Sequence, residues 1–305
     1  MGSNVVEAKG VMWYHISQAS EADLEGLQKS FKFHHLDYDD IRAESPISKM
    51  DPYKHYVFFV FHIPSIHKET GHVYGEEVYV FLSKDALVTV THVEIKVLDE
   101  LFERMQRSTK LRGSVLGNGP AFAMHRVLAE LFRDSMQIVS QLTQETHRLE
   151  DAIEKRHDKR LTVDLAHARR NVLFLRHVID PQRSMLTSLS NLKRTFIPMN
   201  VHVYLDDVHD ILDTVWLSAD NLKLIIDGLF DVNEALLSHK TNEVVTVLTI
   251  VSVAFMFPTL IGSFYGMNVP WLPWFESQAV VYSLYAGGFI GMLVLVLAIV
   301  KRPRS

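Results

Sequence analysis

The chain has 305 residues, a formal net charge of −5 at pH 7, no cysteine and 48% hydrophobic residues. The lack of cysteine excludes disulfides and thiolate metal sites, and the mild acidity argues against a nucleic-acid partner. No glycine-rich phosphate loop, paired-histidine helix or nucleophile elbow is present, so we do not expect an enzyme.

The first part of the chain predicts a cytoplasmic α/β domain over residues 1–115. Short runs rich in Val, Tyr and Phe, separated by turn residues, predict strands at 11–16, 55–63, 77–82 and 86–91. Between the first two runs, residues 22–31 and 36–42 predict short helices, and residues 67–76 predict a long hairpin connection.

Two long helices are expected next, at about 120–156 and 162–192. Pro120 follows a Gly-Asn-Gly break and suits a first helical position. Apolar residues then recur at three- and four-residue spacings, as on one face of a helix. Residues 116–200 therefore predict an antiparallel hairpin of long helices.

A third helix is expected to start near Val201 and to meet no breaker before Pro258. A helix over 201–264 would be about 95 Å long at 1.5 Å per residue. It would form a cytoplasmic stalk that continues into the membrane and links the two parts mechanically.

Two long uncharged runs predict membrane-spanning helices. Val244–Phe264 has 21 residues without a charge, and Ala279–Val300 has 22. About 20 apolar residues cross a lipid bilayer as a helix. We therefore assign the first span to the end of 201–264, an external loop to 265–278, the second span to 279–300 and a tail to 301–305.

The charges near the spans predict their orientation. The tail carries Lys301, Arg302 and Arg304, whereas the loop contains no Lys or Arg and a single acid, Glu276. Basic residues flank the cytoplasmic ends of membrane helices. The chain should therefore be a multi-pass protein of the cell membrane with both termini in the cytoplasm.

One face of the first span is mildly polar. Its positions, three or four residues apart, share a helix face: Asn242, Val245, Thr249, Ser252, Met256, Thr259 and Ser263, with Leu248 at the border. Two spans cannot enclose a pore within one chain, so this polar stripe predicts the wall of a pore in an oligomer. Helix packing through small hydroxyl residues is the alternative.

The stripe also bears on the ion. It offers no His, Asp, Glu or Cys within the span. Zn²⁺ prefers nitrogen and sulfur ligands, whereas Mg²⁺ takes oxygen ligands and gives up water reluctantly. Hydroxyls, an amide and carbonyls therefore suit a hard cation that keeps its hydration shell.

Four acids of the stalk recur every seven residues and should share a face: Asp206, Asp213, Asp220 and Asp227. We expect a solvated helix face, and a cation-attracting surface is the alternative.

The sequence at the ends of the first span resembles the CorA family of divalent-cation transporters. The segment YGMN, 265–268, closes that span, and KTNE, 240–243, leads into it. A Gly-Met-Asn motif after the first of two C-terminal spans is the family signature. The segments HHLDYDDI, 34–41, and YVFFV, 56–60, are also similar to family sequence.

The resemblance implies a funnel-shaped homopentamer in the inner or plasma membrane. Gly266, Met267 and Asn268 would form the external, ion-selective entrance, and Asp231 a ring at the cytoplasmic mouth. It points to Asp207 as the ligand of a regulatory ion between subunits. The partner residue is expected on the hairpin near residues 67–69, which lacks an Asp here.

The function that the resemblance implies is influx of hydrated Mg²⁺ through a pore gated by intracellular Mg²⁺, with Val245, Leu248 and Met256 as an apolar gate. Mg²⁺ would be both the transported and the regulatory ion, and Co²⁺, Ni²⁺ and Zn²⁺ stay open as cargo. A zinc transporter of the ZntB type and a non-conducting membrane scaffold or sensor are the alternatives, and the choice between channel and proton-coupled transport is open.

Overall fold

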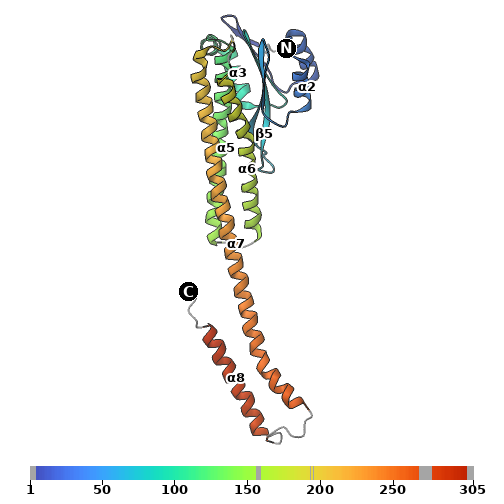
Figure 1. Ribbon diagram of the computed structural model, residues 1–305, viewed down its shortest axis with the longest axis vertical. Coiled ribbons are helices and arrows are strands. Elements are labelled where there is room, and N and C mark those ends of the chain that lie inside the picture. The colour runs from blue at the N-terminus through green and yellow to red at the C-terminus, as the bar shows by residue number, and fades with distance from the viewer. Residues whose placement is uncertain (1–4, 156–158, 193, 195, 268–276, 301–305) are drawn as a thin grey trace. The chain divides into compact units, whose positions relative to one another are not determined.

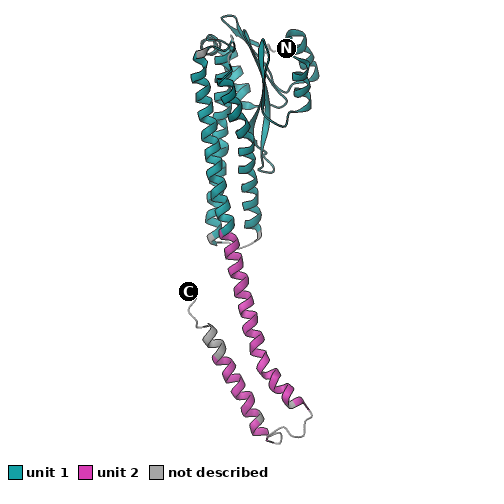
Figure 2. Ribbon diagram, in the orientation of Figure 1, with its two compact units in different colours: residues 1–231 teal, residues 232–305 magenta. Residues whose placement is uncertain are grey.

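The computed structural model describes residues 5–155, 159–192, 194, 196–267 and 277–300 (Figure 1). The chain divides into two compact units, residues 1–231 and 232–305 (Figure 2). The division falls inside one helix, and the six-part division expected from the sequence stays a prediction.

Unit 1 contains a six-stranded sheet in the order β1-β2-β6-β5-β4-β3. Its strands are β1 Val5–Ala8, β2 Val11–Ile16, β3 Lys49–Pro52, β4 Tyr56–Ile66, β5 Val73–Ser83 and β6 Ala86–Thr91. β2 pairs with β6 in parallel, and the other neighbours are antiparallel. The sequence missed β1 and β3, which are four-residue edge strands with little periodic signal.

The long hairpin connection expected at 67–76 is wrong. β4 and β5 stay paired out to Ile66 and Val73, so the turn between them occupies only 67–72. The ends of both strands are only partly buried, so polar side chains are tolerated there. The strands can therefore continue beyond the apolar run that marked them in the sequence.

The sheet is covered on both faces, which explains the continuous burial of β6 and most of β4. α1 Glu21–Ser30 and α2 His35–Ala43 cover one face with Leu24, Leu27, Tyr38 and Ile41. On the other face α5 packs on β4, where Phe61 and Phe132 meet edge to face. Two helices that the sequence did not predict, α3 Lys96–Arg107 and α4 Thr109–Leu116, connect β6 to α5.

The long helices agree with the expected pattern. α5 spans Pro120–Lys155, α6 Lys159–Ser190 and α7 His202–Gly266, after the short 3-10 turn η1 Met199–Val201. Within unit 1, α7 buries one stripe at three- and four-residue steps: Leu205, Val208, Leu212, Val215, Ala219, Leu222 and Ile226. Here α7 is thus a packed helix of the soluble part.

Three of the four regularly spaced acids of α7 pair with arginines of α6. Asp213 lies 2.5 Å from Arg183, Asp220 3.1 Å from Arg176, and Asp227 2.9 Å from Arg169. The arginines also recur every seven residues, so the two antiparallel helices match pair by pair. Arg176 and Arg183 both lie over the ring of Trp216, at 5.2 and 4.5 Å.

The solvated helix face that we expected, and its alternative of a cation-attracting surface, are therefore both wrong at these three positions. Their carboxylates are about one-third exposed or less, and each already has a guanidinium partner. Asp206, without this kind of partner in the described residues, is exposed.

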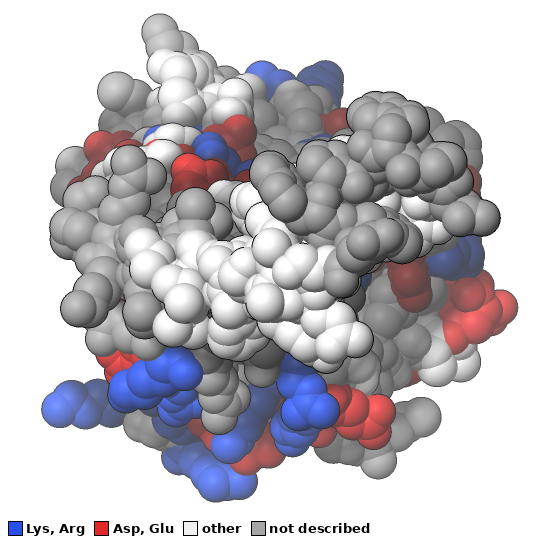
Figure 3. Space-filling view, turned by 90° about the horizontal axis from the view of Figure 1, so that it is seen from below, with Lys and Arg blue, Asp and Glu red and all other residues white. Residues whose placement is uncertain are grey.

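Unit 2 consists of the end of α7 and of α8, Gln278–Val300. Ile261 of α7 packs closely on Gly288 of α8. A Cβ atom added to Gly288 would lie 3.2 Å from the Cδ1 atom of Ile261. Seen from below, the foremost described residues form a broad uncharged area (Figure 3).

Among the described residues, one helix is long and apolar enough to cross a membrane. It lies within His202–Phe264, and its most apolar window has a mean hydropathy of 2.4 and no buried residue. α8 coincides with the second predicted span, and its crossing of the bilayer stays a prediction.

Candidate ion pathway and metal-binding residues

All positions of the polar stripe lie on exposed parts of α7. Val245, Leu248 and Met256 are 54%, 64% and 52% exposed, and the Asn, Ser and Thr positions are also exposed. The less exposed residues of this segment lie at Ile250, Val253, Ala254, Pro258 and Ile261. α8 therefore leaves the stripe uncovered, and another copy of the chain or a pore can face it.

Three hydroxyl groups of the stripe donate hydrogen bonds to carbonyl groups of their own helix. Thr249 donates to the carbonyl of Val245 at 2.8 Å, and Ser252 donates to that of Leu248 at 2.8 Å. Thr259 donates likewise to Phe255 at 2.7 Å. These donors are satisfied without a partner helix, and the oxygen lone pairs left outward suit a cation or its water shell.

The Gly-Met-Asn segment lies only partly in the described region. α7 ends at Gly266, and the Met267 amide donates to the carbonyl of Ser263 at 3.2 Å. Asn268 lies outside the described residues, as do Trp271 and Trp274 of the loop. The role expected for Asn268 stays a prediction.

Asp207 already has two partners within its own chain. Arg133 of α5 donates to its Oδ2 atom at 3.3 Å, and Nε2 of His125 lies 3.5 Å from the same oxygen. Burial lowers the pKa of His125, and although Asp207 opposes that shift, the net change is downward. One carboxylate that pairs with a guanidinium, with a single imidazole nitrogen nearby, does not form a divalent-cation site in a single chain.

The other predicted metal ligand, Asp231, is exposed at the end of unit 1. It lies 24 residues after Asp207 on the same helix, about 36 Å away at 1.5 Å per residue. The two carboxylates cannot share an ion within one chain.

The hairpin expected to supply the partner of Asp207 forms a tight turn. His67 and His72 are joined by a backbone hydrogen bond of 2.9 Å, and Gly71 donates to His67 at 2.8 Å. His67 and Glu69 are exposed and carry the ligand-type side chains at the start of this turn.

A preformed acidic cluster that the sequence reading missed lies at Asp37, Asp40 and Asp51, whose carboxylate oxygens come within 4.8 Å of one another. Lys49 occupies the cluster, with Nζ 2.6 Å from Asp40 and 3.2 Å from Asp51. The buried Asp37 accepts hydrogen bonds from the hydroxyls of Tyr53 and Tyr56, at 2.7 and 2.6 Å. Each carboxylate of the cluster therefore already has a partner within the chain, either Lys49 or the two tyrosines, and the family-like segment 34–41 supplies part of this network.

Comparison with known proteins agrees with this arrangement over nearly the whole chain. The family model described as "CorA-like Mg2+ transporter protein" matches residues 8–302. The cobalt/magnesium transport protein CorA of Thermotoga maritima is 26% identical, with 93% of this chain and 81% of that protein covered.

Solved structures share the fold. The complete CorA magnesium transporter of Methanocaldococcus jannaschii has a TM-score of 0.81 at 17% identity, with 97% of this chain and 92% of that chain covered. The cytoplasmic domain of ZntB from Vibrio parahaemolyticus has a TM-score of 0.60 at 11% identity, with 77% and 90% covered.

The match of the family model from residue 8 to residue 302, together with the shared fold, shows that this chain belongs to the CorA family of divalent-cation transporters.

Proposed function

We propose that the chain is one subunit of a homopentameric channel that admits hydrated Mg²⁺ to the cytoplasm. The observation that carries this proposal is the exposed polar stripe of α7, from Asn242 to Ser263, which presents amide and hydroxyl oxygen atoms and contains no His, Asp, Glu or Cys. Mg²⁺ binds oxygen and retains water, so such a wall can pass it without stripping its shell.

Two features support an oligomer. Two spans per chain do not enclose a pore, so the stripes of several copies must face one axis. In unit 1, α7 also exposes apolar side chains beside its packed face: Val203, Leu217, Leu224 and Ile225. In a pore of this kind, α7 of a second copy of the chain would cover these apolar side chains.

The basic tail supports the orientation. Lys301, Arg302 and Arg304 follow α8 directly, and basic flanks stay cytoplasmic. With two spans, unit 1 and both termini lie in the cytoplasm of a cell whose inner or plasma membrane holds the protein.

We further propose Asp207 and Asp231 as contacts for an intracellular divalent ion that closes the pore. A neighbouring subunit must supply further oxygen ligands at Asp207, because this chain surrounds it with Arg133 and His125. Ion binding there competes with these two partners. Val245, Leu248 and Met256, exposed on the stripe, are the proposed apolar gate.

Zinc transport is the second candidate. It is favoured by the similarity of unit 1 to the ZntB cytoplasmic domain and is opposed by the lack of His, Asp, Glu or Cys between Val244 and Phe264. Co²⁺ and Ni²⁺ fit the same hydrated-ion argument as Mg²⁺. A scaffold that conducts nothing would need no polar stripe.

A substitution at the expected pore entrance tests the proposal. Asn268→Ala should abolish Mg²⁺ uptake into proteoliposomes while the oligomer still assembles, because the neutral amide oxygen that meets the hydrated ion is removed. Asn221→Ala, an exposed Asn on the soluble part of α7, is the control and should conduct normally. Wild-type flux in an assembled Asn268→Ala protein would refute the role of the entrance.

A further inference from the structure

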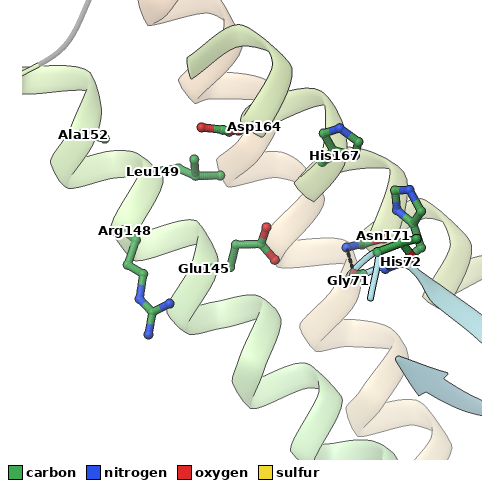
Figure 4. Close-up of a pocket in the computed structure, with 10 residues that line it drawn as sticks. Gly71, His72, Glu145, Arg148, Leu149, Ala152, Asp164, His167 and Asn171 are labelled. Atoms are coloured by element: carbon green, nitrogen blue, oxygen red, sulfur yellow. Dashed lines mark hydrogen bonds between the residues drawn. The ribbon is translucent and has the colours of Figure 1, made fainter. Parts of the chain in front are cut away.

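A cavity of about 490 Å³ opens between the β4–β5 turn, α5 and α6 in unit 1, far along the sequence from the polar stripe. The turn contributes Thr70, Gly71 and His72. α5 contributes Glu145 and Arg148, and α6 contributes Asp164, His167 and Asn171 (Figure 4).

Four side chains with metal-ligating atoms line this cavity: His72, Glu145, Asp164 and His167. Within the described part of the chain, none of their side chains makes a hydrogen bond or an ion pair. Nδ1 of His72 is fully buried without a hydrogen-bond partner. Figure 4 shows Arg148 directed away from Glu145, so it does not neutralise that carboxylate by contact.

The electrostatics of the cavity are those of an incompletely compensated negative site. Burial raises the pKa of Glu145, and the nearby charge of Asp164 raises it further, against smaller opposing effects of His167 and Arg148. Two carboxylates that disfavour each other's charge in a half-buried cavity are stabilised when a cation binds between them.

The turn holds His72 in place for such a role. Asn171 accepts a hydrogen bond from the Val73 amide at 3.1 Å and donates to the Gly71 carbonyl at 2.9 Å, clamping the chain on both sides of His72. The rings of His72 and His167 stack with centroids 5.2 Å apart. Two imidazoles, one from the turn and one from α6, thus lie next to each other at the cavity.

We propose that this cavity is a binding site for a first-row transition-metal dication such as Zn²⁺, with His72, His167, Glu145 and Asp164 as ligands. Imidazole and carboxylate together suit Zn²⁺, Co²⁺ or Ni²⁺, whereas Mg²⁺ takes oxygen ligands. In the described residues, groups of three ligand atoms already within 4.8 Å are limited to Asp37, Asp40 and Asp51. The cavity site therefore forms by side-chain rotation as the metal binds.

Such a site would tie the β4–β5 turn to α5 and α6. It shares no residue with the polar stripe, and among the described residues the Asp207 carboxylate pairs with Arg133 and His125 and with none of the four ligands. The inference therefore does not depend on the ion that the pore conducts.

The test is titration of the chelator-stripped full chain in detergent with Zn²⁺, followed by calorimetry, and with Co²⁺, followed by its visible spectrum. The pocket variant is His72→Gln with His167→Gln. The matched control is His147→Gln with His239→Gln, because each of these exposed histidines lies beside a glutamate on its own helix.

Wild-type and control protein should each bind one equivalent of Zn²⁺ per chain at the cavity. The pocket variant should lose this equivalent or bind it at least about tenfold more weakly. Glu145→Gln with Asp164→Asn should weaken the same equivalent, which provides a second test if the histidine variant misfolds. Equal Zn²⁺ binding by folded pocket variants and control would overturn the site. Complete displacement of Zn²⁺ by an equal concentration of Mg²⁺ would also overturn it, because nitrogen ligation would then play no part.

Discussion

At the scale of single residues, Asp207 faces competing partners. In this chain Arg133 and His125 hold the carboxylate from α5, whereas the proposed gating ion would need it free. Asp207 therefore has one of two roles. Either its carboxylate forms a permanent ion pair that joins α7 to α5, or the carboxylate exchanges Arg133 and His125 for a divalent ion when the pore closes.

Asp207→Asn should weaken the inhibition of flux by internal Mg²⁺, because the charged ligand is lost. Mg²⁺ bound between subunits should hold the α7 helices together and slow their cleavage by a protease, and the substitution should reduce this protection. Asp206→Asn, at the exposed neighbouring position, is the control and should retain both. Unchanged inhibition in Asp207→Asn would leave Asp207 with a purely structural role.

Asp99 of α3 is a partly buried titrating group of unit 1. Nε2 of His15 lies 2.8 Å from Asp99, and Nδ1 of the same ring lies 2.8 Å from Thr89. Burial would raise the pKa of Asp99, but hydrogen bonds from His15 and Ser17 outweigh it and the net pKa is lowered.

The folded pKa of Asp99 thus lies below the unfolded value of about 3.9. Its stabilisation is present above that value and is lost as the pH falls through the folded pKa. Asp99→Asn should therefore flatten the acid limb of a plot of melting temperature against pH, measured by circular dichroism. Parallel acid limbs in variant and wild type would contradict this assignment.

At the scale of elements, α6 completes the hydrogen bonding of β4. β3 pairs with β4 only as far as Val60, so the backbone of His62 lies beyond the end of the edge strand. Gln182 of α6 takes over, accepting from the His62 amide at 3.2 Å and donating to its carbonyl at 2.8 Å. A buried polar side chain in a helix thus replaces a strand.

Gln182→Leu should destabilise unit 1 by about 1–3 kcal/mol for each backbone group left unsatisfied. Gln141→Leu, at an exposed position of α5, should change stability little. Chemical denaturation of the two variants measures the difference. Equal unfolding midpoints would show that water or another group satisfies His62.

Elements with a strong period could be predicted from the sequence, whereas pairings between elements could not. The apolar spacing gives α5, α6 and α7, and the Val- and Phe-rich runs give the central strands. β1 and β3 escaped because four residues carry too little periodicity. The arginine partners of Asp213, Asp220 and Asp227 escaped because a spacing of seven shows that side chains share a face without showing what covers it.

The candidate sites divide in the same way. The polar stripe follows from helix periodicity alone, so its common face on α7 could be predicted. The pairing of Asp207 with Arg133, 74 positions away, depends on how α5 and α7 pack. The His72 and His167 cavity likewise joins residues from a turn and a helix that no local pattern connects.

At the scale of the whole molecule, conduction requires several copies of the chain around one pore. Native mass spectrometry of the protein in detergent should give an oligomer, because the polar stripes must surround a pore and the exposed apolar side chains of α7 must be covered. The resemblance to the CorA family implies that this oligomer is a pentamer. Leu217→Lys with Leu224→Lys should weaken the assembly, since both side chains are exposed in the single chain. A predominantly monomeric or dimeric wild-type protein would contradict this arrangement.

Conduction of hydrated Mg²⁺ is tested most directly by ion uptake into proteoliposomes that contain the wild-type chain, measured for Mg²⁺ and Zn²⁺ in parallel without a proton gradient. We predict Mg²⁺ uptake that exceeds both that of Zn²⁺ and the leak of protein-free vesicles, because the polar stripe offers oxygen ligands to a hydrated cation. Uptake of Zn²⁺ alone would favour the zinc transporter. Uptake of neither ion by assembled protein would contradict conduction through this pore.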